Sequence, residues 1–142
     1  MYYSGNILVI EIAKNEIGNK GGEKYWRWYG FNQRVNWCAI FLSWCANESG
    51  TINNTIPRFS LCTDGVKWYK DHSKWKNKSY IHQTGDIIFF DWNGDGHVQH
   101  VGIVEKVENG KVYTIEGNSK DEVRNKSYSL NNKSIYGYRS VN

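Results

Sequence analysis

The sequence lacks the features that mark several large classes of protein. Its 142 residues include three cysteines, one proline and one methionine, and no apolar run approaches the roughly 18–20 residues of a membrane-spanning helix. The odd number of cysteines argues against a disulfide framework, and none of their spacings resembles a zinc site. The opening stretch MYYSGNILVIEIAKNEIG lacks the basic segment and the cleavage site of a secretory signal. We therefore expect neither a membrane span nor a signal peptide.

The charge pattern excludes one class of partner. The formal net charge is +4, a mild excess, and lysines are interspersed with acidic residues rather than gathered in runs. This pattern does not indicate a nucleic-acid partner. It would suit an anionic polymer, although many surfaces without such a partner look the same.

Aromatic side chains are abundant. The chain has seven tryptophans, ten tyrosines and five phenylalanines, a heavy load for a small domain. Such residues serve both in cores and in binding grooves. The length allows one compact domain with a core, and there is no internal repeat, low-complexity tract or Pro/Ser-rich linker. Residues 1–142 are therefore interpreted as a single domain.

Helix signals occupy the first half of the chain. An amphipathic pattern predicts a helix over 6–17, and a third helix is predicted across 62–75. Between them, Asn36 is expected to cap a helix over 37–48 that is apolar nearly all round and hence buried. The segment 23–36, EKYWRWYGFNQRVN, is predicted to be a polar-aromatic loop.

From residue 85 onward the sequence changes to β-branched and aromatic runs separated by Gly, Asn and Asp. These runs predict five strands, over 85–92, 100–107, 111–118, 123–130 and 134–141. Helices followed by a meander of antiparallel strands indicate an α+β fold.

Cys38 is the candidate nucleophile. It falls at the first or second position of the predicted helix 37–48, where free N–H groups and the helix dipole favour a thiolate. Cys45 shares its face, but seven residues span about 10.5 Å along a helix axis, too far for a disulfide. We expect Cys45 to be an inert core thiol. Cys62 is expected to be a similar core thiol or, as the second choice, the partner of Cys45.

A thiol nucleophile needs a base, and the chain offers four histidines. His72 and His82 lie on a charged helix face and in a polar loop, and both are predicted to be surface residues. His97 lies in a loop, three residues before His100. His100 opens the predicted strand 100–107 and is the preferred base, with His97 as the second choice.

The turn after this strand sets the register of the predicted hairpin. The sequence ENG over 108–110 fits a type I turn closed by Gly110 in the left-handed conformation, which pairs Val107 with Lys111. The alternative is a two-residue type I′ turn at Asn109-Gly110. A slip of one residue between these registers would reverse every side chain of the strand.

We prefer the first register because it separates a polar face from an apolar one. It places Gly102 opposite Glu116 and His100 opposite Asn118, all on one side of the sheet. Glu116 or Asn118 could then hold the imidazole in the tautomer that lets its other nitrogen reach the thiol.

The motifs NWCAIFLSWC and GDIIFFDWNGDGHVQHVGIVEKVENGKVYTIEGNS resemble the CHAP family, the cysteine, histidine-dependent amidohydrolase/peptidases. The resemblance covers most of the chain. It implies a papain-like fold with N-terminal helices packed on an antiparallel sheet. Position by position, it implies a nucleophile at Cys38, a general base at His100 and an orienting acid at Glu116, with Asn118 as a fourth polar member.

The resemblance further implies a peptidoglycan hydrolase of the endolysin or autolysin type that cleaves an amide bond. Gln33 and Trp37 are candidates for oxyanion or substrate contacts, and Asn118 is an alternative to Gln33 as the side-chain donor to the oxyanion. The bond is either the muramoyl-alanine amide or a peptide bond. The alternative function is a non-catalytic wall-peptide-binding or structural module of a phage tail or secretion apparatus. We expect a monomer acting at the bacterial cell wall, as a phage lysis protein or a fragment of a larger protein.

The loop DWNGDGH is a candidate calcium site. Asp91, Asn93 and Asp95, followed by Gly96, reproduce the first half of an EF-hand-like loop. The bidentate glutamate expected at the twelfth position is replaced by Gly102. Asp and Asn are also natural turn residues. We therefore expect no required cofactor, and calcium at these three residues only as a weak ligand.

Overall fold

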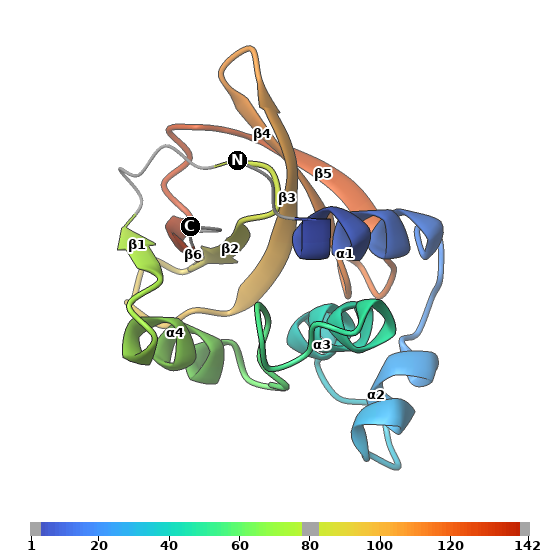
Figure 1. Ribbon diagram of the computed structural model, residues 1–142. Coiled ribbons are helices and arrows are strands. Elements are labelled where there is room, and N and C mark those ends of the chain that lie inside the picture. The colour runs from blue at the N-terminus through green and yellow to red at the C-terminus, as the bar shows by residue number, and fades with distance from the viewer. Residues whose placement is uncertain (1–3, 78–82, 140–142) are drawn as a thin grey trace.

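The computed structural model describes residues 4–77 and 83–139 (Figure 1). Within these residues the helices come first along the chain: α1 (Ser4–Asn15), α2 (Glu23–Tyr29), α3 (Cys38–Ser49) and α4 (Cys62–Asp71). The strands follow: β1 (Trp75–Asn77), β2 (Ile87–Phe90), β3 (His100–Glu108), β4 (Lys111–Glu116), β5 (Arg124–Ser129) and β6 (Ile135–Arg139). The α+β fold class is thus confirmed. None of the described helices is long and apolar enough to cross a membrane.

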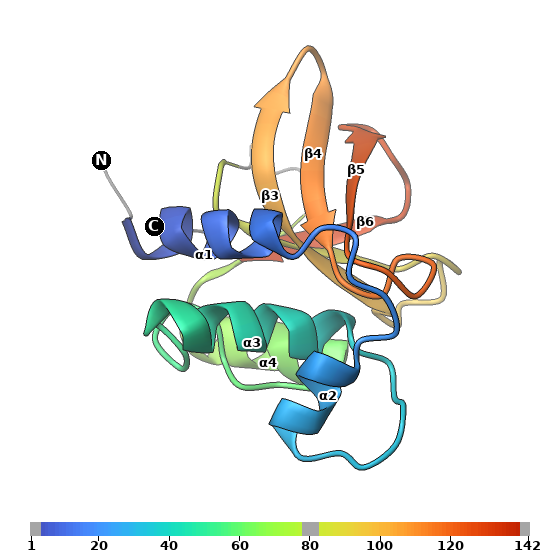
Figure 2. The ribbon, with the colours of Figure 1, turned by 90° about the vertical axis from the view of Figure 1, so that its right-hand side faces the viewer.

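The strands form one antiparallel sheet in the order β1-β6-β2-β3-β4-β5. The β3–β4 hairpin projects beyond the rest of the molecule, and α1 crosses beside its base (Figure 2). Helix α3 packs against both α1 and β3. The buried helix α3 therefore connects the helical half to the middle of the sheet.

The two faces of the sheet carry separate hydrophobic clusters. Alternating residues of β2 divide between them, because successive side chains of a strand point to opposite faces. Ile87 and Phe89 join the main core with α1 and α3, whereas Ile88 and Phe90 join a smaller cluster on the other face. Each fully buried large apolar side chain contributes about 1.5–3 kcal/mol. The main core is therefore the principal source of stability.

Helix α2 was not expected, since its residues were predicted to be a loop. Gly22, with a φ of 70°, precedes it and Gly30, with a φ of 122°, ends it. Within this helix, the ring of Tyr25 is fully buried. It stacks on the ring of Trp37 and contacts the ring of Phe41 edge-on. Tertiary packing of aromatic residues stabilises this short helix, and the sequence shows no amphipathic period there.

The start of α3 differs from the prediction in one detail. Trp37, not Asn36, is the N-cap residue, and no side chain caps the helix. The Asn36 amide oxygen instead accepts a hydrogen bond from Asn118 at 3.2 Å. The first residue of the helix is Cys38, as expected. Helix α4 ends at Asp71, and Trp75, the last residue of the helix predicted across 62–75, begins β1 instead.

The predicted turn of the β3–β4 hairpin is wrong. Asn109 and Gly110 both have positive φ, 54° and 76°, and Glu108 pairs directly with Lys111. This is the two-residue type I′ turn, which the Asn-Gly dipeptide favours because both central positions need φ above zero.

The faces predicted for Gly102 and Glu116, farther along the hairpin, are nevertheless correct, because a β-bulge follows the turn. The pairing shifts between Val104 and Lys106, so that Ile103 pairs with Ile115. The extra residue, Glu105, cancels the one-residue difference between the two turns. Gly102 consequently lies over Glu116: a Cβ on Gly102 would lie 2.7 Å from the Glu116 Cγ.

Candidate active site

Cys38 lies at the N-terminus of α3, with 4% of its surface exposed. A hydrogen bond from Cys62 lowers the pKa of its thiol well below the ordinary value, against the opposing effect of burial. A hydrogen bond from His100, the charge of that imidazole and the backbone N–H of Ala39 act in the same direction. The local environment therefore favours a thiolate at Cys38.

His100 begins β3 and is held by Glu116. The two side chains are joined at 2.8 Å between the histidine Nε2 and the glutamate Oε1, and both are buried. This bond leaves Nδ1 of the imidazole for the contact with Cys38. Of the two residues predicted to hold the imidazole, Glu116 is the one that does so.

The second oxygen of Glu116 also has partners. Thr114 donates a hydrogen bond to Oε2 at 2.6 Å, and Tyr128 donates another at 2.7 Å. Burial and the neighbouring carboxylate raise the pKa of the Tyr128 phenol, so it remains a donor. These donors fix the orientation of the carboxylate behind the histidine. Thr114 could have been found from the sequence, since it lies two residues before Glu116 on the same face of the strand.

The imidazole titrates at high pH. Burial lowers the pKa of His100, but hydrogen bonds and charges from Cys38 and Glu116 outweigh it and raise the pKa to about 9. The protonated imidazole is therefore stable near neutral pH beside a thiolate. Such a thiolate–imidazolium pair combines a nucleophile and a general acid in one contact.

Cys62 was expected to be a core thiol like Cys45 or, as the second choice, the partner of Cys45. It is a buried core thiol and is free, so the pairing with Cys45 is wrong. Its contact with Cys38 was not expected. Cys62 is the first residue of α4, and its Sγ lies 3.6 Å from the Sγ of Cys38. The hydrogen bond to Cys38 and burial raise the pKa of the Cys62 thiol, so it remains the donor. The two cysteines are 24 residues apart on different helices, and no sequence pattern indicates the contact. Burial likewise raises the pKa of Cys45, which fits its expected place as a core thiol.

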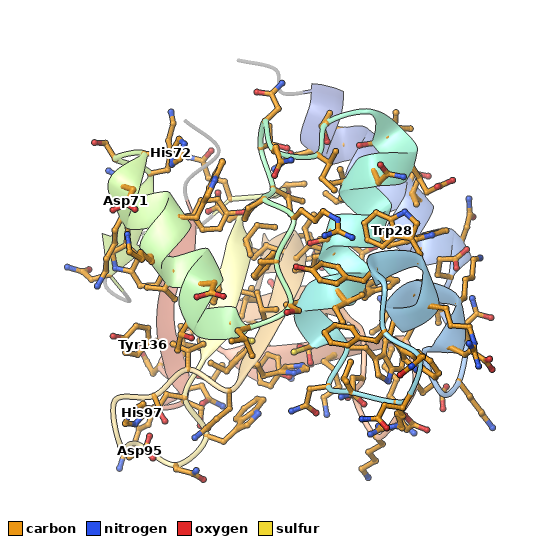
Figure 3. All side chains as sticks on the ribbon, turned by 90° about the horizontal axis from the view of Figure 1, so that it is seen from below. Trp28, Asp71, His72, Asp95, His97 and Tyr136 are labelled. Atoms are coloured by element: carbon orange, nitrogen blue, oxygen red, sulfur yellow. The ribbon has the colours of Figure 1, made fainter. Side chains whose placement is uncertain are left out.

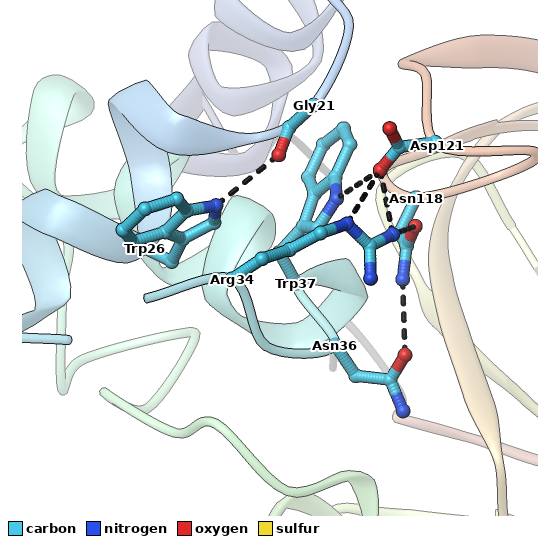
Figure 4. A network of polar contacts seen from close by, with 7 residues as sticks. All are labelled: Gly21, Trp26, Arg34, Asn36, Trp37, Asn118 and Asp121. Atoms are coloured by element: carbon cyan, nitrogen blue, oxygen red, sulfur yellow. Dashed lines mark hydrogen bonds and ion pairs between the residues drawn. The ribbon is translucent and has the colours of Figure 1, made fainter. Parts of the chain in front are cut away.

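Asn118 lies in a polar network that joins the start of α3 to the loop after β4 (Figure 4). Its amide oxygen accepts from Arg34 at 3.1 Å and its amide nitrogen donates to Asn36 at 3.2 Å. The carboxylate of Asp121 accepts a hydrogen bond from the Arg34 guanidinium at 2.6 Å and one from the indole N–H of Trp37 at 3.2 Å. Asn118 thus orients the chain around Cys38, and Glu116 takes the contact with the histidine.

The two residues expected at the oxyanion or substrate are placed differently. The Trp37 side chain is fully buried, so the expectation of a direct substrate contact is wrong for its ring. The ring packs above Gly22, where an added Cβ would meet the indole at 2.3 Å. Gln33 is exposed in the loop between α2 and α3, and it is not among the residues that line the cavity beside Cys38.

One cavity is lined by Cys38 and another by His100. The cavity on the cysteine side has a volume of about 230 Å³ and is lined in part by Cys38, Cys62 and Gln99. An adjoining apolar hollow of about 320 Å³ lies between the loop before α3 and the loop before α4. On the histidine side a third cavity, of about 290 Å³, is lined by Trp92, His100, Glu116, Asn118, Ser119, Lys120, Lys126 and Tyr128. These cavities give a ligand space beside the thiol and beside the imidazole.

The candidate calcium loop is held together by hydrogen bonds. The two oxygens of Asp91 accept the backbone N–H groups of Gly94 and Gly96 at 2.9 and 2.8 Å. Burial raises the pKa of Asp91, but these N–H groups outweigh it and lower the pKa overall. Asn93 and Asp95 are exposed. Among the described residues, no group of three His, Cys, Asp or Glu side chains is placed to hold a metal. Calcium binding at this loop stays a prediction.

Two other histidines, His72 and His97, fall within the described residues. Figure 3 shows His72 with Asp71 at the end of α4, and His97 with Asp95 in the loop before β3. Both histidines are exposed. The imidazole of His72 stacks on Trp68, with ring centroids 3.9 Å apart. His82 lies outside the described residues.

The fold is similar to that of solved structures. The crystal structures of Ly7917 and of Ly7917 with the hydrolyzing product of MDP match 95% of this chain, with TM-scores of 0.60 and 0.63 and 16% sequence identity. This chain spans 62% of the length of those chains. An NlpC/P60 family protein from Bacillus cereus matches at a TM-score of 0.47, with 19% identity over 94% of this chain and 39% of its own. No curated protein matches the sequence.

Cys38, His100 and Glu116 bring together a candidate nucleophile, a candidate base and a carboxylate that holds the base. The family model of the CHAP domain matches residues 28–118, more than half of the chain. The chain belongs to the CHAP family.

Proposed function

We propose that this CHAP domain hydrolyses an amide bond of bacterial peptidoglycan, with Cys38 as nucleophile, His100 as general acid and base, and Glu116 as the orienting carboxylate. The observation that carries the proposal is that His100 interacts with both Cys38 and Glu116, and that all three side chains are buried. Family membership supports the class of reaction. The hydrolyzing product of MDP described with Ly7917 supports the substrate class.

The first half of the reaction forms a thioester. The Cys38 thiolate attacks the amide carbonyl carbon, and the carbonyl electrons move to oxygen. The backbone N–H of Cys38, free at the first position of α3, is placed to stabilise this oxyanion. The His100 imidazolium then gives its Nδ1 proton to the amine as the carbon–nitrogen bond breaks.

The second half releases the product. Neutral His100 takes a proton from water, and the hydroxide attacks the thioester carbon. The carbon–sulfur bond breaks, which restores the Cys38 thiolate and frees a carboxylic acid. Glu116 keeps Nε2 in place through both halves and stabilises the imidazolium. No metal enters either step.

The cavity lined by Cys38 and the cavity lined by His100 offer space for parts of a branched peptide near the scissile bond. They favour neither a peptide endopeptidase nor an N-acetylmuramoyl-L-alanine amidase over the other. The proposed partner is peptidoglycan, the proposed place of action is the bacterial cell wall, and the protein is proposed to act as a monomer. Size-exclusion chromatography with light scattering tests the last point.

Turbidity of purified cell-wall suspensions tests the proposal. We expect the native chain to clear the suspension and Cys38→Ala to fall to background. Cys45→Ala, which removes another buried thiol, is the matched control and should keep full activity. Lysis by Cys38→Ala at the native rate would exclude the thiol mechanism. Binding of walls without lysis by any variant would instead favour a non-catalytic wall-binding or structural module.

Mass spectrometry of the released fragments then identifies the bond. A new free amine on L-alanine indicates the amidase reaction, and a new amine elsewhere in the peptide indicates an endopeptidase. A parallel measurement of melting temperature with calcium and with EDTA tests the loop at Asp91. A higher melting temperature with calcium, lost on Asp91→Asn, would establish calcium binding.

A further inference from the structure

Two thiols face each other at the proposed active site. The Sγ atoms of Cys38 and Cys62 are 3.6 Å apart, and each cysteine is the first residue of its helix, α3 and α4. Both side chains are buried, with 4% and 8% of their surface exposed. In the proposed mechanism only the Cys38 sulfur bonds to the substrate. The Cys62 sulfur is a hydrogen-bond partner of Cys38 and forms no bond to the substrate.

The pair can be reached by a small solute. Cys38 and Cys62 both line the cavity of about 230 Å³ on the cysteine side of the site. Hydrogen peroxide is only slightly larger than water, so this space admits it. The third thiol, Cys45, is buried deeper in α3 and does not line this cavity. The chain therefore places two of its three thiols together in an accessible site.

We propose that Cys38 and Cys62 form an oxidative modification site, in which hydrogen peroxide converts the two thiols into a reversible disulfide that blocks the nucleophile. Formation of the disulfide needs only the two cysteines. Its effect on hydrolysis rests on the proposed function.

The reaction has two balanced steps. The Cys38 thiolate attacks one oxygen of peroxide, the oxygen–oxygen bond breaks, and the leaving hydroxide takes a proton to become water. The product is a sulfenic acid, Cys38–SOH. The Cys62 sulfur then attacks the Cys38 sulfur, the sulfur–oxygen bond breaks, and the hydroxide leaves as a second water with the proton of Cys62. Two thiols and one peroxide thus give one disulfide and two waters.

The geometry favours the second step. A disulfide needs a sulfur–sulfur distance of about 2.0 Å, so the two atoms must approach by roughly 1.5 Å. That change is within the reach of side-chain rotation at two helix starts. Because Cys62 already contacts the Cys38 sulfur, it competes with further peroxide for the sulfenic acid. It therefore protects Cys38 from irreversible oxidation to the sulfinic acid.

Peptide mapping tests the site directly. Trypsin cleaves after Arg58, which separates the peptide 35–58, with Cys38 and Cys45, from the peptide 59–67, with Cys62. We expect the peroxide-treated native chain, alkylated and digested without reductant, to yield these two peptides joined by a disulfide. The Cys45→Ala variant should give the same product and so assigns it to Cys38. Free Cys62 beside a sulfinic or sulfonic Cys38, or a joined product that disappears in Cys45→Ala, would overturn the proposal.

Wall lysis tests the consequence, with each variant compared with its own untreated rate. We expect peroxide to lower the activity of the native chain and of Cys45→Ala more than tenfold, and dithiothreitol to restore both. Cys62→Ala should also lose activity, but dithiothreitol should not restore it after prolonged treatment, because its sulfenic acid oxidises further. Equal recovery of Cys62→Ala and the native chain would overturn the protective role.

The two measurements also separate this inference from the proposed function. A joined peptide from a chain that never lyses walls would leave the disulfide established and the hydrolase proposal rejected. An active chain that yields no joined peptide would give the opposite result.

Discussion

Helices α3 and α4 begin in the same way but give their first residues opposite properties. Cys38 and Cys62 each start a helix, neither helix has a side-chain cap, and both thiols are buried. Yet the pKa of Cys38 lies well below its ordinary value, whereas the pKa of Cys62 is raised. A helix N-terminus alone therefore does not produce a nucleophilic thiolate in this protein.

The two thiols differ in pKa because only Cys38 has His100 as a further partner. The hydrogen bond between the thiols is the largest influence on both, and it favours a single negative charge shared by two sulfurs. His100 contacts Cys38, so its imidazolium places the charge on that sulfur. Both thiols lie at a helix N-terminus, and the contact with His100 of β3 determines that Cys38 is the one that ionises.

The largest expected effect follows from removing this partner. In His100→Ala we expect wall lysis to fall by about 10²- to 10⁴-fold, the usual contribution of a general acid and base. The pKa of Cys38 should rise. The rate at which iodoacetamide alkylates Cys38 at pH 7 should fall by a factor of about ten or more, since each pKa unit above the pH lowers the thiolate fraction tenfold.

Alkylation of Cys38 and Cys62 is followed by mass spectrometry of their separate tryptic peptides. His97→Ala, in the exposed loop before β3, is the matched control and should change neither rate. An unchanged alkylation rate in His100→Ala would show that the two helix starts differ for another reason.

A smaller effect is expected from Glu116→Gln. The native kcat/KM should be high between the lowered pKa of Cys38 and the pKa of His100, about 9, and should fall as the imidazolium is lost above that value. Glu116 raises the pKa of His100, so the neutral amide should move this upper limit to lower pH. We expect kcat/KM at neutral pH to fall by about 10- to 100-fold.

The pH profile of wall lysis measures this change. Its lower and upper pH limits are properties of Cys38 and His100 together, because the two groups titrate as a coupled pair. Glu108→Gln, beside the exposed hairpin turn, is the control and should keep the native profile. An upper limit that stays at about 9 in Glu116→Gln would contradict the role given to the carboxylate.

The smallest expected effect comes from the exposed network that fixes the start of α3. Arg34→Ala removes the ion pair with Asp121 and the hydrogen bond to Asn118. Exposed ion pairs contribute about 0–1 kcal/mol, so we expect unfolding free energy to fall by less than about 1 kcal/mol. Wall lysis should fall only a few-fold, because Trp37 still holds Asp121.

Thermal and denaturant unfolding measure the stability change. Arg27→Ala removes another exposed ion pair, with Glu23 in α2, and should lower stability by a similar amount without an effect on lysis. A loss above about 2 kcal/mol in Arg34→Ala would show that this network carries the fold of the site.

Much of the fold and of the candidate site could be predicted from local signals. The apolar run of α3 indicates a buried helix, and the polar face of β3 and β4 indicates that His100 and Glu116 lie side by side. Cys62 could not be found in this way, because its contact with Cys38 depends on how two distant helix starts meet. Helix α2 was missed for a related reason: it forms because Tyr25 packs against α3, and its own sequence has no helical period.

The β-bulge at Glu105 has a consequence for the length of the hairpin. Because this residue is unpaired, β3 contains one residue more than the stretch of β4 that it faces. Removing Glu105 alone would leave a regular ladder with every present pairing intact. Removing one residue between the turn and Glu116 would instead carry that carboxylate to the helical side of the sheet, away from His100. We therefore expect the hairpin to tolerate the loss of Glu105 from β3 better than the loss of a residue from β4.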